Sequence, residues 1–226
     1  MMQPARVILI LLRIMIVGGI GEDLTFHEHT FEYSQVHAAE SADVYISLSV
    51  AGGFPDIQGM TLAGREVSKN SVSDSVGGGF KVGIFPQATR RALGVELEYF
   101  GTTGRLSTLT SSNGTETEGT AGLTVLNSMF NIILRQPSGA LRPYGGVGIG
   151  YSGGILHGAD FPDRSNRDFD STTNFAYQFM GGLQWEVRGR TFVFAEYKYL
   201  ATDLHWKGMS LDYRASYVLA GFGWSF

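Results

Sequence analysis

The chain has 226 residues, of which 43% are hydrophobic, and a formal net charge of −4. That charge, spread without a long basic run, argues against nucleic acid as a partner. The absence of cysteine excludes disulfides, thiolate nucleophiles and cysteine-based metal sites. The chain holds 31 glycines and 12% aromatic residues beside only 6 prolines, a balance that favours closely packed strands over helices.

The first residues have the pattern of a segment that directs export. Arg6 supplies a positive start, and an apolar run follows from Val7 to Ile20. Gly19 and Gly21 then place small residues where a signal peptidase cleaves. We therefore expect residues 1–21 to be a signal peptide and residues 22–42 to be a short periplasmic segment. A retained N-terminal anchor is the alternative, although the apolar run is short for a spanning helix.

From residue 43 onward, apolar residues recur at every second position, the period of a β-strand. The alternating segments are 43–52, 78–85, 93–100, 125–135, 142–153, 174–187, 191–200 and 217–226. One parity of each segment is apolar, and the other carries glycine, small polar residues and isolated charges. Segments of about ten residues with this alternation are typical of transmembrane β-strands. The pattern predicts an all-β fold over residues 43–226: an eight-stranded antiparallel up-and-down transmembrane β-barrel.

The connections between these segments alternate in length. Long connections are expected at 54–76, 102–120 and 155–172, a medium one at 201–213, and short ones at 86–92, 136–140 and 188–190. Outer-membrane barrels have long extracellular loops and short periplasmic turns, so this alternation predicts the bacterial outer membrane with both chain termini on the periplasmic side. A soluble sandwich or lipocalin-like barrel is the alternative. Aromatic residues near the strand ends, on the apolar parity, argue against it because they suit a membrane interface.

Several stretches resemble a known family. "LRPYGGVGIGYSGG", "FAYQFMGGLQWEV" and "FVFAEYKYL" look like the eight-stranded opacity-protein and OmpA-type superfamily of bacterial outer-membrane β-barrels. The final "YVLAGFGWSF" resembles the C-terminal assembly signal of outer-membrane proteins, with Phe222, Trp224 and Phe226 on one parity. The resemblance covers residues 43–226 and implies insertion by the outer-membrane assembly machinery. We expect these three aromatic residues to face outer-membrane lipids.

The opposite parity predicts a charged lumen. It is formed by Lys81, Glu96, Glu98, Arg135, Glu186, Glu196 and Lys198. A buried charge is costly unless it is paired, so we expect opposite signs to meet, with Glu96 and Glu98 facing Arg135 or Lys81. An eight-stranded barrel is only just wide enough for its own side chains, which favours a salt-bridge network that fills the lumen. A gated ion path through these charges is the alternative, and Glu96 with Glu98 could in principle perform acid–base chemistry.

The long connections are rich in small polar residues and are the expected seat of any recognition. Their aromatic residues, expected to be exposed, are Phe161, Phe169 and Trp206. An acidic stretch carries Asp160, Asp163, Asp168 and Asp170, which could attract a divalent cation, although the spacing is not that of an EF-hand loop. Three histidines, His27, His29 and His37, lie in an unpatterned polar segment and are expected to be solvated. We predict no metal site and no cofactor.

These features predict a structural or surface-interaction barrel without enzymatic activity, serving envelope integrity, adhesion or recognition of an extracellular ligand by the loops. A narrow channel for small solutes is one alternative. A lipid A-modifying enzyme is the other, and it would need a serine, a histidine and an acid near the outer rim. The candidates are Ser152, His157, Asp203 and His205, although no spacing links either histidine to a serine.

Overall fold

The computed structural model describes residues 42–62, 64–67, 69–112, 115–160 and 169–226. The predicted signal peptide and the three histidines lie outside these residues, as do Phe161, Asp163 and Asp168. Of the predicted periplasmic segment 22–42, only Ala42 is described. The described strands all belong to one compact unit, residues 41–225. In this described part of the chain, no helix has the length and apolar character needed to cross a membrane.

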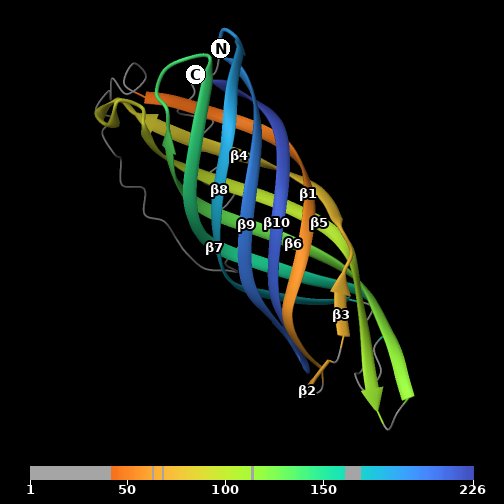
Figure 1. Ribbon diagram of the computed structural model, residues 1–226. Coiled ribbons are helices and arrows are strands. Elements are labelled where there is room, and N and C mark those ends of the chain that lie inside the picture. Colours follow the sequence, from red (N-terminus) through yellow and green to blue (C-terminus); the bar gives the residue numbers. More distant parts are fainter. Residues whose placement is uncertain (1–41, 63, 68, 113–114, 161–168) are drawn as a thin grey trace, which may run out of the picture. The chain divides into compact units, whose positions relative to one another are not determined.

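Eight long strands form a closed antiparallel ring (Figure 1), in which each strand pairs with the next and the last pairs with the first. The strands are β1 (Ala42–Leu62), β4 (Ser75–Pro86), β5 (Leu93–Ser112), β6 (Thr115–Arg135), β7 (Leu141–Asp160), β8 (Phe169–Arg188), β9 (Thr191–Trp206) and β10 (Met209–Ser225). Two short strands, β2 (Arg65–Glu66) and β3 (Lys69–Val72), pair with β1 and β5. The predicted eight-stranded up-and-down barrel is confirmed.

The two ends of the barrel differ in their connections. At one end, the start of β1 lies beside the end of β10, with Ile46 opposite Trp224. We call this end the turn end. The short connections 87–92, 136–140 and 189–190 lie here, and the first of them contains the 3-10 helix η1 (Gln87–Thr89). The opposite end, lowest in Figure 1, is the loop end. Because β10 closes onto β1, the ring leaves no open sheet edge along this seam, as a hydrocarbon surrounding requires.

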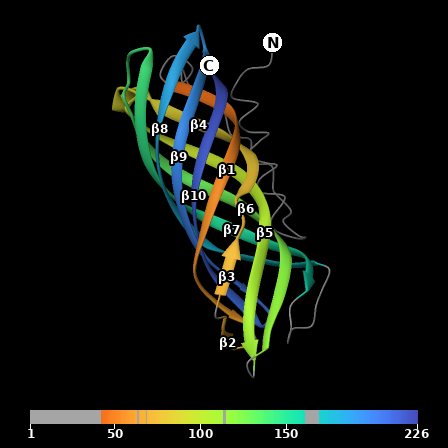
Figure 2. The same ribbon diagram turned by 45° about the vertical axis from the view of Figure 1, so that its right-hand side comes forward.

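The prediction was wrong about the connections at the loop end, where the strands continue far beyond the segments that the sequence predicted. Strands β5 and β6 remain paired as far as Ser112 opposite Thr115, and β9 and β10 as far as Trp206 opposite Met209. The hairpin of β5 and β6 projects furthest at this end (Figure 2). The expected loops 102–120 and 201–213 are therefore mostly paired strands.

These extensions escaped prediction because the apolar parity changes along the strands. Near the turn end of β6, Phe130 and Leu134 point outward and are 44% and 64% exposed, while Asn131 points inward and is buried. Nearer the loop end, the inward residue is Leu123, which is buried, and the outward neighbour is Thr124. When the apolar residues of a strand switch from the outward to the inward positions, the alternation of apolar and polar residues in the sequence is interrupted. The sequence pattern therefore ends at the switch, although the strand continues.

Glycine on the inward parity makes room for larger polar side chains. A Cβ atom added at Gly83 would lie 2.3 Å from the Tyr45 ring, and one at Gly148 would lie 1.9 Å from Asn131 Oδ1. Both distances are far inside van der Waals contact, so a larger residue would force the Tyr45 or Asn131 side chain to move. At these two positions, glycine leaves space for the side chain of the residue that pairs with it on the neighbouring strand.

Candidate functional site

Five charged side chains meet in the middle of the lumen, and we call them the central belt. They are Lys81 on β4, Glu96 and Glu98 on β5, and Glu196 and Lys198 on β9. Each is at most 4% exposed. The alternation of the strands points all five inward, and β9 lies opposite β5 in the ring, so the belt crosses the lumen from wall to wall.

The belt is held by short ion pairs. Lys81 Nζ lies 2.6 Å from Glu196 Oε2 and 3.6 Å from the nearer oxygens of Glu96 and Glu98. Lys198 Nζ contacts Glu98 Oε1 directly and lies 3.4 Å from Glu196 Oε1. Because each ammonium group bridges carboxylates of different strands, the belt ties opposite walls together and fills the cross-section of the lumen.

Neutral polar side chains complete the belt. Asn131 Nδ2 donates to Glu96 and Glu98 over 2.9 and 3.2 Å, and Gln178 Nε2 donates to Glu98 over 2.8 Å. The Tyr144 hydroxyl donates to Glu196 over 2.9 Å, and the Tyr45 hydroxyl donates to Glu96. Such donors reduce the cost of burying the carboxylates.

A second set of charges lies between the belt and the turn end. Arg135 donates through Nη2 to Asp43 Oδ2 over 2.5 Å, and its guanidinium carbon lies 3.7 Å from the centre of the Phe85 ring. Arg142 lies 2.5 Å from Glu186 and 4.0 Å from Asp43. Of the two expected partners of Glu96 and Glu98, Lys81 is confirmed, at 3.6 Å from both. Arg135 was wrong, because it is the last residue of β6 and meets the second residue of β1 instead.

Six of the seven charged residues that the sequence assigned to the lumen are buried, at 4% exposure or less. The exception is Glu186, whose side chain is 38% exposed and lies at the turn-end rim with Arg142. Sequence reasoning missed Asp43, Tyr45 and Tyr144. Their inward parity was the available signal, since each belongs to a strand whose neighbouring positions are apolar and outward.

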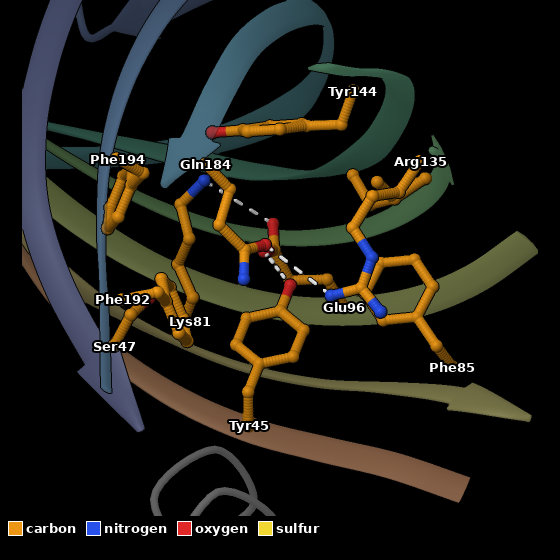
Figure 3. Close-up of a pocket in the computed structure, with 11 residues that line it drawn as sticks. Tyr45, Ser47, Lys81, Phe85, Glu96, Arg135, Tyr144, Gln184, Phe192 and Phe194 are labelled. Atoms are coloured by element: carbon orange, nitrogen blue, oxygen red, sulfur yellow. Dashed lines mark hydrogen bonds and ion pairs between the residues drawn. The ribbon is translucent and has the colours of Figure 1, made fainter. Parts of the chain in front are cut away.

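A small cavity of about 20 Å³ lies on the turn-end side of the belt. Figure 3 shows that its lining side chains converge from different strands of the barrel. The polar ones include Lys81, Glu96, Arg135 and Gln184, and the apolar ones include Phe192. A volume of this size accommodates a water molecule, and a cavity with polar walls is one that water enters.

On the loop-end side of the belt, the interior is apolar, and we call this region the apolar core. Its largest fully buried leucines are Leu106, Leu123, Leu156, Leu200, Leu204 and Leu211, joined by aromatic residues of β9 and β10. Trp206 was expected to be exposed on a loop, but it is only 7% exposed and donates from its indole nitrogen to Gly154 O over 3.2 Å. The sequence signal for this buried position was the alternation of apolar and polar residues, with Leu204, Trp206, Leu211 and Tyr213 as the apolar members.

The aromatic residues at the end of β10 lie on the outer surface. Phe222, Trp224 and Phe226 are 43%, 44% and 53% exposed, and the rings of Phe222 and Trp224 are 5.2 Å apart. They follow Val218, which is 53% exposed, on the same parity. The outward face of this strand is therefore apolar throughout its turn-end half.

The serine and histidine residues considered for catalysis lie on opposite faces of the wall. Ser152 is buried and donates to Asn127 inside the barrel, while His157 is exposed and contacts Thr124 over 3.2 Å. His205 is also exposed, within 3.3 Å of Asn174. The structure does not bring Ser152 together with either histidine.

The structure describes only some of the loop residues that the sequence suggested for ligand or cation binding. Of the four aspartates considered for a cation, Asp160 and Asp170 are described. Within the described ranges, no three histidine or acidic residues are grouped so that they could hold a metal ion. Phe169 is 63% exposed on the outer face of the loop end.

Comparisons with known proteins agree with this architecture. The chain matches the family model described as outer membrane protein beta-barrel domain over residues 33–226. Neisserial surface protein A is similar at 13% identity, covering 83% of this chain and 100% of that chain with a TM-score of 0.52. OprG from Pseudomonas aeruginosa is similar at 16% identity, covering 82% and 96% with a TM-score of 0.58. At these identities, the two structures show a shared fold alone.

Among curated proteins, no match was found. The family match covers most of the chain, and the closed ring of eight strands has the same architecture. The chain therefore belongs to the outer membrane protein beta-barrel domain family and is an eight-stranded barrel of the OmpA and opacity type from the bacterial outer membrane.

Proposed function

We propose that this chain is a structural, surface-displayed barrel whose lumen does not conduct and whose loop-end hairpins present a recognition surface outside the cell. The observation that carries this proposal is the double closure of the lumen. The central belt fills it with cross-lumen ion pairs, and the apolar core fills it again toward the loop end. A solute would have to displace both sets of side chains to pass.

The change of parity along the strands supports the second half of the proposal. Around the turn-end half, the outward residues are apolar and suited to lipid, with Phe222, Trp224 and Phe226 at the border nearest the turn end. We propose that these three residues contact outer-membrane lipids and are read by the assembly machinery. Around the loop-end half, outward residues such as Arg105 and Asp203 are polar and exposed, as on a soluble domain.

The loop-end half is accordingly a folded platform with its own apolar core rather than a set of loose loops. Buried leucines from six strands hold the hairpins in register, and each buried leucine contributes roughly 1.5–3 kcal/mol. A rigid platform loses little conformational entropy when it binds a partner, which suits a recognition surface.

Planar-bilayer recording tests the closure of the lumen. The purified, refolded chain is reconstituted and its conductance is compared with that of an open porin inserted under the same conditions. We expect no stepwise conductance. Reproducible single-channel steps from the folded chain would overturn the proposal and favour the narrow channel.

The display of the platform can be tested with single cysteines, because the chain has none of its own. Phe169→Cys places a thiol on the exposed loop-end surface, and Ser138→Cys places one in an exposed turn-end connection. A membrane-impermeant maleimide should label the first variant on intact cells and the second only after lysis. The reverse pattern would show that the platform faces the periplasm.

Recognition itself can be tested by shortening the longest hairpin. In this variant, a two-residue turn replaces residues 105–122, which pair with each other at the loop end. Adhesion of expressing cells to cultured epithelial cells should fall to the level of cells without the barrel, while heat-modifiable gel mobility stays that of a folded barrel. Unchanged adhesion would remove this hairpin from the recognition surface.

A further inference from the structure

The charges of the central belt do not balance. Glu96, Glu98 and Glu196 contribute three carboxylates, whereas Lys81 and Lys198 contribute two ammonium groups. All five side chains are at most 4% exposed, so water cannot screen the difference. If every group were ionised, the belt would carry one uncompensated negative charge, which costs several kcal/mol in a protein interior.

Neighbouring charges do not correct this imbalance. Arg135 is buried beside the belt, but its guanidinium group is already in contact with the Asp43 carboxylate at 2.5 Å. The next pair outward, Arg142 and Glu186, also joins one cation to one carboxylate at 2.5 Å. These two pairs add two cations and two carboxylates, so the excess of one carboxylate in the belt remains.

The contacts single out Glu96 as the carboxylate with the weakest compensation. Glu98 is in direct contact with Lys198 and accepts from Gln178, and Glu196 lies 2.6 Å from Lys81. Glu96 reaches an ammonium group only at 3.6 Å, too far for a hydrogen bond with it. Its closest partners are the Asn131 amide and the Tyr45 hydroxyl, which are both neutral.

The cavity beside Glu96 is unsuited to a metal cation. Two of its lining residues, Arg135 and Gln184, are 3% and 7% exposed and have donor nitrogens, Nε and Nε2, without a hydrogen-bond acceptor among the described residues. N–H groups repel a cation and require an oxygen acceptor, which a water molecule in about 20 Å³ supplies. The missing positive charge is therefore better supplied by a proton on the carboxyl group.

We propose that Glu96 is a proton-binding site and carries a proton in the folded barrel at neutral pH, so that the central belt is electrically neutral. The Tyr45 hydroxyl can accept as well as donate, so the contact between Tyr45 and Glu96 is compatible with a carboxylic acid as one partner. The cavity places this acid next to a water-sized space on the turn-end side, while the apolar core lies on the other side of the belt.

The polar and charged side chains around Glu96 come from most strands of the ring. Each of them is either neutral or already included in the charge count of the belt and its neighbouring ion pairs. They are Tyr45 on β1, Lys81 on β4, Glu98 on β5, Asn131 and Arg135 on β6, Tyr144 on β7, Gln178 and Gln184 on β8, and Glu196 and Lys198 on β9. The proposal is independent of what the loop-end surface binds.

Infrared spectroscopy tests the proton directly. The folded wild-type barrel, in a detergent without ester or carboxyl groups, should show the carbonyl band of a protonated carboxylic acid at neutral pH. Labelling glutamate with carbon-13 should shift the band, and Glu96→Gln should remove it. Absence of this band from the folded wild type would overturn the proposal without any variant having to fold.

Unfolding equilibria give an independent test with a matched control. Glu96→Gln replaces a neutral acid by a neutral amide and should keep the folding equilibrium constant within about threefold of the wild type. Lys198→Met, the control, removes the ammonium group that bridges Glu98 and Glu196, and it should lower the folding equilibrium constant by about a hundredfold or more. Equal losses in both variants, or a large gain in Glu96→Gln, would show that Glu96 is ionised.

The same equilibria separate a proton from a metal cation. Replacing sodium by choline at constant ionic strength and pH should leave the wild-type folding equilibrium unchanged. A selective loss of stability that sodium restores, and that Glu96→Gln abolishes, would show that a cation occupies the site and would overturn the proposal.

Discussion

The turn-end half and the loop-end half of the barrel are built from the same strands but have opposite distributions of polar and apolar residues. In the turn-end half, the outer face is apolar, and the interior holds charges, amides and tyrosines beside a small apolar cluster that includes Phe85, Ile133 and Phe192. In the loop-end half, the outer face is polar and the interior is a core of leucine, methionine and aromatic residues. The surroundings explain the difference, because lipid covers the outside of one half and water covers the outside of the other.

The comparison shows what each half depends on. Hydrocarbon gives no hydrophobic advantage to an apolar interior, so the turn-end half relies on directional ion pairs and hydrogen bonds. Water does give that advantage, so the loop-end half relies on buried apolar area, as a soluble protein does. Substitutions should therefore be most harmful for different reasons in the two halves.

The largest effect is expected from breaking the central belt. Lys198→Met leaves Glu98 and Glu196 without their shared ammonium group and should lower the free energy of unfolding by about 3–5 kcal/mol. Urea unfolding, followed by heat-modifiable gel mobility, measures this change. Arg105→Met, at an exposed loop-end position, is the matched control and should change it by no more than about 0.5 kcal/mol. Equal effects would show that the belt does not stabilise the barrel.

A cavity in the apolar core should cost nearly as much. Leu204 is fully buried, so Leu204→Ala should lower the free energy of unfolding by about 2–5 kcal/mol in the same assay. Its neighbour Asp203 points outward, and Asp203→Ala should have an effect within about 0.5 kcal/mol. If Leu204→Ala were as mild as Asp203→Ala, the loop-end half would lack a packed core.

A charge on the outer face tests where lipid surrounds the barrel. Phe130 lies midway along the apolar outer band of β6, so Phe130→Arg should destabilise the inserted barrel by about 2–4 kcal/mol. Trp224→Arg, near the end of the band, should cost about 0–1 kcal/mol. The measurement is folding into bilayers of defined thickness, and equal costs at both positions would contradict the assigned depth.

The smallest effect is expected from crowding the belt. A methyl group at position 148 would meet Asn131, a donor to two belt carboxylates, so Gly148→Ala should cost about 1–3 kcal/mol in unfolding. Gly158→Ala is not a suitable control because Gly158 has a positive φ of 57°. Gly52, where nothing lies within 4 Å of an added Cβ, is suitable, and Gly52→Ala should be nearly neutral. Tolerance of Gly148→Ala would mean that the belt has room to adjust.

The sequence by itself determined the strand count, the alternation and the inward position of Lys81, Glu96, Glu98, Glu196 and Lys198. Strand periodicity depends only on neighbouring residues, so it can be read locally. The reach of the strands into the loop end was missed, because the change of parity between Val125 and Leu126 resembles the end of a strand.

Only the tertiary structure decided which charges meet. Glu98 and Lys198 are separated by 100 positions, and Arg135 and Asp43 by 92, so their contacts depend on ring closure and on the register of every strand between them. A one-residue slip in any pairing would turn a whole strand's inward side chains outward. The belt, its excess carboxylate and the cavity beside Glu96 are therefore properties of the closed barrel, because no single strand contains them.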